Sequence, residues 1–139
     1  MLAPSVDTQM LRLARNYIAD PAHFTTGVRH QGDRVCALGA IEYADDSNRP
    51  PGALDTLAED HYPVVALLAR ASRELWPGDV EASGPGAGGY EGLPASLEYP
   101  YQASDLLRDS YRVAQTNNQL GHEATVQMFD RAIELSIPT

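Results

Sequence analysis

The chain has 139 residues, 43% hydrophobic and 21% charged, which predicts one soluble domain able to bury a core without metal or disulfide. Its formal net charge is −9, and its ten basic residues, all arginine, are scattered singly, which argues against nucleic-acid binding. The chain has one cysteine, no secretory leader and no apolar run near the roughly 20 residues of a membrane span. These features predict a cytoplasmic protein without membrane contact.

The first third of the chain begins with an amphipathic pattern. Apolar residues at helical spacing predict a helix over 6–19, and Asp20-Pro21 ends it because the residue before proline avoids the α region. A polar connector follows over 21–33, with turn chemistry at Gln31-Gly32-Asp33. No strand is expected there.

The middle of the chain predicts short helices. One spans 34–44, where Gly39 weakens the helix by roughly 1 kcal/mol but lets a neighbouring helix approach closely. We therefore expect Gly39 to have a structural role in packing. One or two helical turns follow over 53–60, and Pro63 opens a helix with a wide apolar face that ends at Leu75.

Residues 77–103 differ in character from the rest. They include a Gly-rich stretch over 83–89 and then Tyr90, Tyr99 and Tyr101 as sparse aromatic anchors. A structureless stretch of this length is typical of a flexible or function-bearing loop. The alternative is a tolerated insertion, because loop length adds little to closure entropy.

Two helices close the chain. One is predicted over 104–117, and the last, apolar on most of its circumference, over 122–136. With no internal repeat, the fold class is all-α: a single compact domain of about five helices spanning residues 1–139, interrupted by the 77–103 loop.

Two of these helices carry short motifs, Cys36-Ala37-Leu38-Gly39-Ala40 and Asp130-Arg131-Ala132-Ile133. With them the chain resembles a family of unknown function found in actinobacteria and their phages, whose members carry a Cys-Ala-x-Gly-Ala helix and a later Asp-Arg-Ala-Ile helix. Between the motifs the family has an Asn-Asp…Gly-Arg-Thr connector. Here the connector over 116–122 keeps an Asn pair and a Gly but lacks the Arg-Thr. The resemblance implies an actinobacterial or phage origin and supplies no activity.

Cys36 is the candidate nucleophile if the protein is an enzyme, with His122 as a base. The first turn of a helix lowers a thiol pKa through the helix dipole, which would favour a hydrolase or transferase. A free cysteine among apolar neighbours more often packs as a small hydrophobe, so no catalytic residue is expected. His30, Asp33 and Cys36 are three residues apart, but the turn between them does not present one helical face, so neither metal nor cofactor is expected.

Asp130 and Arg131 are charged residues within an apolar helix. A buried charge must be paired, so we expect Asp130 to meet an arginine of another helix, with Arg12, Arg15 and Arg34 as candidates. Both residues are therefore assigned structural roles.

Asn117 and Asn118 are predicted to end a helix through a left-handed residue, and their amides are also ligand candidates. His122 is adjacent, and the loop tyrosines can cover the site. The candidate binding residues are thus Tyr90, Tyr99, Tyr101, Asn117, Asn118 and His122. The favoured function is a small acidic accessory protein that binds a protein partner or itself; the alternatives are a small-molecule-binding protein and the Cys36 enzyme.

Overall fold

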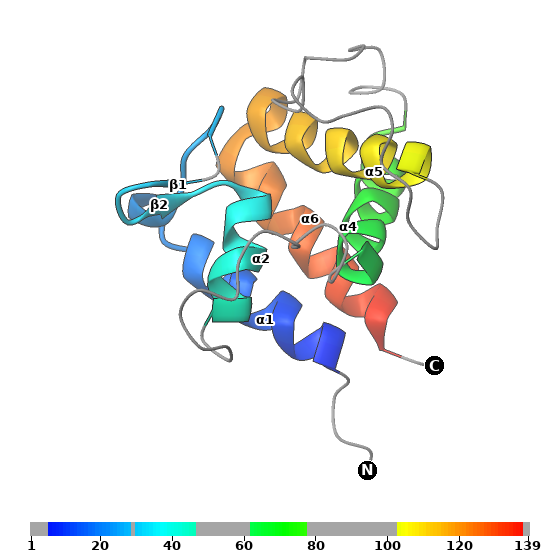
Figure 1. Ribbon diagram of the computed structural model, residues 1–139, viewed down its shortest axis with the longest axis horizontal. Helices are drawn as coiled ribbons and strands as arrows, with labels where there is room; N and C mark the ends of the chain where they lie inside the picture. Colours follow the sequence, from blue (N-terminus) through cyan, green and yellow to red (C-terminus); the bar gives the residue numbers. More distant parts are fainter. Residues whose placement is uncertain (1–5, 29, 47–61, 78–102, 138–139) are drawn as a thin grey trace.

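The computed structural model describes residues 6–28, 30–46, 62–77 and 103–137 (Figure 1). The helical turns predicted over 53–60 and the loop predicted over 77–103, apart from its two ends, lie outside these residues. The helices are α1 (Val6–Ile18), α2 (Ala37–Asp46), α4 (Tyr62–Leu75), α5 (Ala103–Gln115) and α6 (Gly121–Ser136). Shorter elements are the 3-10 turn η1 (Pro21–His23), strands β1 (His30–Gln31) and β2 (Arg34–Val35), and the π-helical turn η2 (Thr116–Leu120).

The chain is mainly α-helical, as predicted, but the expectation of no strand was wrong. β1 pairs antiparallel with β2, with His30 opposite Val35 and Gln31 opposite Arg34. Gly32 closes the hairpin at φ 63°, a left-handed conformation that glycine adopts without a Cβ clash. Arg34 and Val35 are therefore extended, and the second helix starts at Ala37, not at the predicted residue 34.

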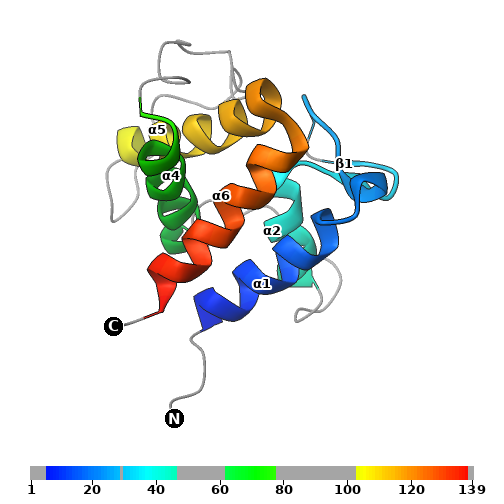
Figure 2. The ribbon, with the colours of Figure 1, turned by 180° about the vertical axis from the view of Figure 1, so that it is seen from behind.

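Helix α6 lies at the centre of the described structure, with α1 on one side and α4 on the other (Figure 2). It runs antiparallel to α1, because Thr8 contacts Ser136 at 2.7 Å near one end and Arg15 contacts Asp130 at 2.8 Å further along. Ser136 Oγ donates to the carbonyl of Ile133, so the Thr8 hydroxyl is the donor to Ser136. The two ends of the fold are thereby held together.

The core forms where the apolar stripes of these helices meet. On α1 the buried residues recur at helical spacing, and on α2 nearly the whole inner surface is buried, including Gly39. Full burial of a large aliphatic or aromatic side chain contributes about 1.5–3 kcal/mol, so this cluster dominates the fold's stability. Its largest members are Leu11, Ile18, Ile41, Val64, Val65, Leu68, Val113, Met128 and Phe129.

A closed circuit of hydrogen bonds joins α4 to the end of α5. Arg112, only 2% exposed, donates from Nε to Ser72 Oγ at 2.8 Å. Ser72 Oγ lies 2.6 Å from Thr116 Oγ1, whose own hydrogen goes to the Arg112 carbonyl, so Ser72 is the donor to Thr116. Each hydroxyl thus donates once and accepts once in a buried setting, where such chains strengthen one another.

The Thr116 side chain takes part in the circuit at the start of the π-helical turn that follows α5. The Thr116 hydroxyl occupies the carbonyl four residues earlier, at 2.9 Å, and competes with the backbone amide that an α-helix would place there. The helix widens over η2 and then turns at Gly121, whose φ of 87° is open to glycine. Arg112 also donates to the Trp76 carbonyl at 2.6 Å, which caps the C-terminal end of α4.

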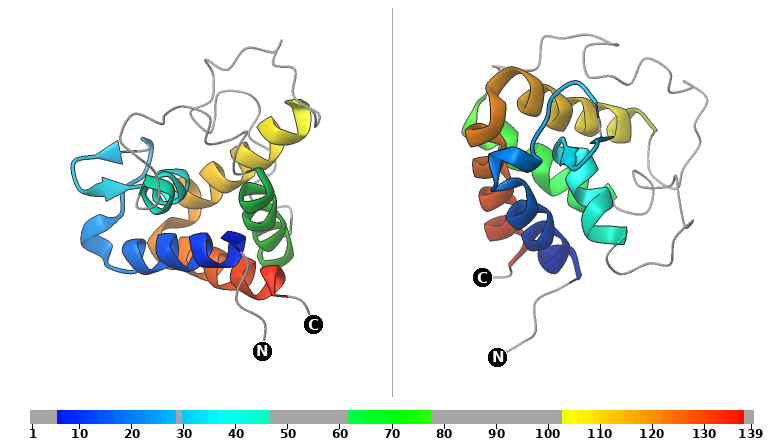
Figure 3. Two further views of the ribbon diagram at one scale, coloured as in Figure 1. Left: turned by 60° about the horizontal axis from the view of Figure 1, so that its bottom comes forward. Right: turned by 90° about the vertical axis from the view of Figure 1, so that its left-hand side faces the viewer.

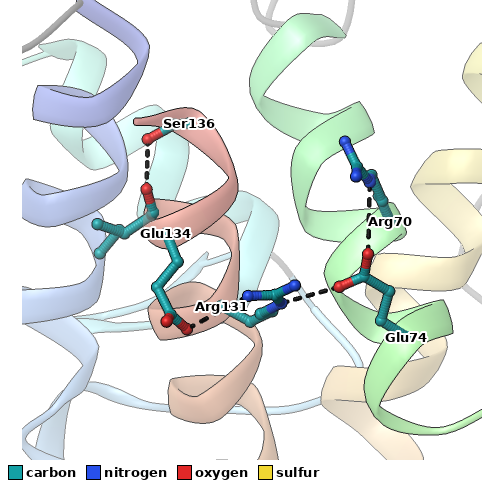
Figure 4. A network of polar contacts seen from close by, with 6 residues as sticks. Arg70, Glu74, Arg131, Glu134 and Ser136 are labelled. Carbon is teal, nitrogen blue, oxygen red and sulfur yellow. Dashed lines mark hydrogen bonds and ion pairs between the residues drawn. The ribbon is translucent and has the colours of Figure 1, made fainter. Parts of the chain in front are cut away.

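Two neighbouring residues of α6 attach it to different helices. Asp130 pairs with Arg15 of α1, one of the three expected partners, although its side chain is 50% exposed and not buried as expected. Arg131 pairs with Glu74 of α4 at 2.8 Å, and Glu74 also contacts Arg70 at 3.5 Å (Figure 4). Arg131 reaches Glu134 at 3.8 Å, so the surface between α4 and α6 carries alternating charges.

Among the residues that the structure describes, no helix combines the length and the apolarity of a membrane span.

Replacing Arg112 by methionine should lower the free energy of unfolding by about 2–4 kcal/mol, because buried acceptors lose their donor. Urea denaturation measures the change. Arg108→Met is the matched control on α5, since Arg108 is exposed, and should shift stability by no more than about 0.5 kcal/mol. Equal losses in the two variants would show that the circuit does not stabilise the fold.

Glu74 should make the fold sensitive to acid. The hydrogen bond and positive charge of Arg131 hold the pKa of Glu74 below its ordinary value of 4.5. A carboxyl with a lowered pKa in the folded state stabilises above its unfolded pKa and loses that contribution as pH falls through its folded pKa.

The melting temperatures of wild type and Glu74→Gln should therefore differ most near pH 7 and converge below pH 4.5. The difference should also shrink in about 1 M salt, where the screening length is about 3 Å. A difference that grows on acidification would contradict the ion-pair origin.

Candidate functional site

Four of the candidate residues, Cys36, Asn117, Asn118 and His122, lie around the start of α2, where η2 and the loop after η1 approach it. The hairpin lies beside this junction, close to the end of α1 (Figure 3). Tyr90, Tyr99 and Tyr101 lie outside the described residues. The structure therefore brings the chain's Asn pair, its cysteine and one histidine into one region of the fold.

Asn117 is fully buried and uses both ends of its amide. Its Oδ1 accepts from the backbone amide of Ala37, the first residue of α2, at 2.9 Å. Its Nδ2 donates to the Thr25 carbonyl and to Asn118 Oδ1, each at 3.1 Å. Asn118 Oδ1 in turn accepts from the amide of Gly27 at 2.9 Å. Asn117 thus supplies, from another part of the chain, the cap that α2 needs.

These contacts bear on the two roles predicted for the Asn pair, which are to end a helix and to bind a ligand. Neither asparagine is a left-handed helix terminator, because both lie in the π-helical turn and the positive φ falls on Gly121. The donors and the acceptor of the Asn117 amide are also occupied within the protein. Its geometry supports a folding role for Asn117, because both ends of its amide are bonded within the protein.

Two imidazoles close the C-terminal end of α1. His122 Nε2 lies 2.6 Å from the carbonyl of Ile18, and His23 Nδ1 lies 3.0 Å from the carbonyl of Tyr17. A carbonyl only accepts, so each of these nitrogens carries a hydrogen. His122 also meets the Phe24 ring edge to face, with centroids 5.0 Å apart. Both rings thus satisfy carbonyls that the helix leaves open.

Cys36 lies directly before α2, not within its first turn as expected. Its carbonyl accepts from the amide of Ala40 at 2.8 Å, the first bond of the helix, and the residue is only 7% exposed. The described histidines have structural contacts: His122 and His23 bond backbone carbonyls, and His30 contacts Glu42 at 3.3 Å. This arrangement supports packing over nucleophilic catalysis.

No group of three or more His, Cys, Asp or Glu residues within the described part of the chain is placed to hold a metal ion. In the triplet, His30 lies in β1, Asp33 in the hairpin turn and Cys36 directly before α2.

A stack of three rings lies on the surface beside this junction. The ring of Tyr17 is parallel to His23 within 6° at a centroid distance of 4.1 Å, and it stacks on Tyr43 at 3.9 Å. At these distances the two neighbours must occupy opposite faces of Tyr17. The Tyr17 hydroxyl donates to the Asp33 carbonyl at 2.6 Å, which fixes the ring against the hairpin turn.

The stack continues outward into exposed side chains. Tyr43 is 43% exposed, and so is Leu13, one turn before Tyr17 on α1. Asp33 of the hairpin turn lies close enough to Tyr17 for its negative charge to act on that residue, and Glu42 precedes Tyr43 in α2, where its carboxylate contacts His30. Partial desolvation, then the negative charge of Asp33, raises the pKa of Tyr17 above 10.0. We call this surface, made of Leu13, Tyr17, His23, Asp33, Glu42 and Tyr43, the stack face.

Sequence reasoning missed the stack face. Tyr17 fits the apolar stripe of α1, and Tyr43 is an isolated aromatic near the end of α2. The sequence offers one partial signal: Asp20-Pro21 ends α1 and turns His23 back toward the helix, where Asp20 Oδ1 accepts from the amide of Ala22 at 2.9 Å. The contact between Tyr17 and Tyr43 joins two helices, and no local sequence pattern predicts it.

Asn117→Ala should lower the free energy of unfolding by about 2–3 kcal/mol, since it leaves the Ala37 amide and the Thr25 carbonyl unsatisfied in a buried site. Urea denaturation tests this. Asn16→Ala, the same change at an exposed position of α1, should be nearly neutral. An Asn117 variant as stable as the Asn16 variant would refute the capping role.

The Cys36 thiol should react with a thiol reagent at least about 100-fold more slowly in the native protein than in denaturant, corresponding to an opening free energy of about 3 kcal/mol. Absorbance of the released chromophore measures both rates. Similar rates would mean an accessible thiol and would restore the nucleophile reading.

Comparison with family models, curated proteins and solved structures finds no match to this chain. The resemblance to the actinobacterial and phage family therefore stays an expectation from its two motifs.

Proposed function

We propose that this protein is an interaction module that binds a partner protein through the stack face. The observation that carries the proposal is the 43% exposure of Tyr43 in a ring stack already ordered by Tyr17 and His23. Tyrosine is enriched at the energetic centres of interfaces. A ring held in place before binding loses little conformational entropy on association.

Charge supports the same function. The chain carries a net charge of −9, the negative charge of Asp33 acts on Tyr17, and Glu42 precedes Tyr43 in α2. Such a surface steers a basic partner toward it and repels nucleic acid. Tyr43 and Leu13 form the apolar part of the surface, which would lose its water when a partner binds. This adds a stabilising contribution that long-range charge attraction does not supply.

The finer expectations from the sequence belong to this proposal. The module is a single α-helical domain of about five helices, an acidic cytoplasmic accessory protein of actinobacterial or phage type. Tyr90, Tyr99 and Tyr101 remain candidate contacts outside the described residues. Small-molecule binding is less favoured, because Asn117 and His122 are engaged within the fold.

The test places a photo-crosslinking amino acid at position 43 and, as a control, at position 75 on α4, where Leu75 is 40% exposed. A partner crosslinked from position 43 is then purified and titrated against unmodified protein. Tyr43→Ala should weaken binding by at least about 30-fold, the effect of an interface centre worth about 2 kcal/mol, whereas Leu75→Ala should not.

Tyr43→Ala removes an exposed side chain, so the variant should stay folded, losing about 0.5–1.5 kcal/mol of stacking; circular dichroism checks this. If position 43 crosslinks to a second copy of the chain, the binding partner is that copy and the proposed function becomes self-association. No crosslink specific to position 43, or a purified partner that binds Tyr43→Ala equally well, would overturn the proposal.

A further inference from the structure

We infer that the stack face takes an arginine side chain from a basic segment of the partner protein, with the guanidinium lying on the outer face of the Tyr43 ring. This inference rests on the proposed function and specifies the chemistry of its partner.

The ring geometry provides the platform. Tyr43 stacks on Tyr17 through one face only, at 3.9 Å and an interplanar angle of 24°. The opposite face of Tyr43 is therefore directed away from the stack, and the residue is 43% exposed. A planar cation within about 6 Å of a tyrosine ring is attracted by the negative potential of the ring face.

The backbone adds to the attraction for a cation. Tyr43 lies in the last turn of α2, and this turn has no basic residue. The C-terminal end of a helix carries a partial negative charge, so a cation there is favourable. A basic partner would supply the compensating charge.

The surrounding charges point the same way. The segment 20–46 contains five carboxylate residues and two arginines. Glu42, next to Tyr43 in α2, contacts His30 at 3.3 Å, so its carboxylate is held toward the hairpin. Arg34, one of the two arginines, donates to the Phe24 carbonyl at 3.3 Å. Asp33, whose negative charge acts on Tyr17, is an acidic group that the structure places beside the stack, and it suits a positively charged partner.

Arginine fits this site better than lysine. Its guanidinium is planar and weakly hydrated, so it stacks on an aromatic ring and still presents N–H donors at its edge to a carboxylate. The lysine ammonium is a compact, strongly hydrated charge that gains little from a flat surface. The partly exposed ring of Tyr43 therefore predicts selectivity for arginine, and not charge attraction alone.

The test titrates the full chain with three blocked five-residue peptides, in which two positions are arginine, lysine or the uncharged isostere citrulline. NMR at low salt follows the ring signals of Tyr43 and the side-chain methylene signals of the peptide. We expect upfield shifts of the arginine methylenes, affinity at least about threefold higher for arginine than for lysine, and no binding of citrulline.

Tyr43→Ala should remove the upfield shifts and the arginine preference, Glu42→Gln should weaken arginine binding, and Leu75→Ala should change neither. Equal affinity for arginine and lysine, or shifts that persist in Tyr43→Ala, would overturn the inference. If the arginine peptide fails while the crosslinked partner still depends on Tyr43, only the arginine assignment is wrong; loss of both results refutes the interaction site itself.

Discussion

The fold depends on one buried junction, the π-helical turn between α5 and α6. Asn117 caps α2 through its side chain, and Thr116 completes the circuit that ties Arg112 to α4. One widened turn therefore fixes four helices relative to one another. A buried amide or guanidinium left without partners would carry a desolvation penalty of about 1–3 kcal/mol, so these contacts also disfavour other packings.

Around that junction, α6 organises the other helices through packing first and charge second. Its buried face, with Met128 and Phe129, contributes the larger share of stability. Asp130 and Arg131 point to α1 and α4 and are partly exposed, where ion pairs contribute at most about 1 kcal/mol. Because the two charges have opposite signs, they help to fix how α6 aligns with α1 and α4. They add little to the free energy of unfolding.

Periodicity predicts much of this fold, because α1, α4 and α6 have strong apolar stripes. The boundary signals are also clear, with Asp20-Pro21 at the end of α1 and Pro63 at the start of α4. The hairpin escaped prediction because two-residue strands are too short to show a period of two. The π-helical turn escaped as well, since its contacts join partners distant in sequence. The expected close approach of a helix at Gly39 stays a prediction, although the residue is buried.

At the candidate site, the chemical type of a residue is visible in the sequence, but its contacts depend on the tertiary structure. Sequence reasoning selected Cys36, Asn117 and His122 for their reactive or polar groups. The side chains of Asn117 and His122 satisfy the ends of α2 and α1, whereas Cys36 takes part through its backbone carbonyl. Folding alone gives no reason to leave part of an ordered aromatic stack in water, since burial of that surface would stabilise the protein by about 25 cal/mol per Å². We propose that the exposed ring of Tyr43 serves binding, and the net charge of −9 favours a basic partner.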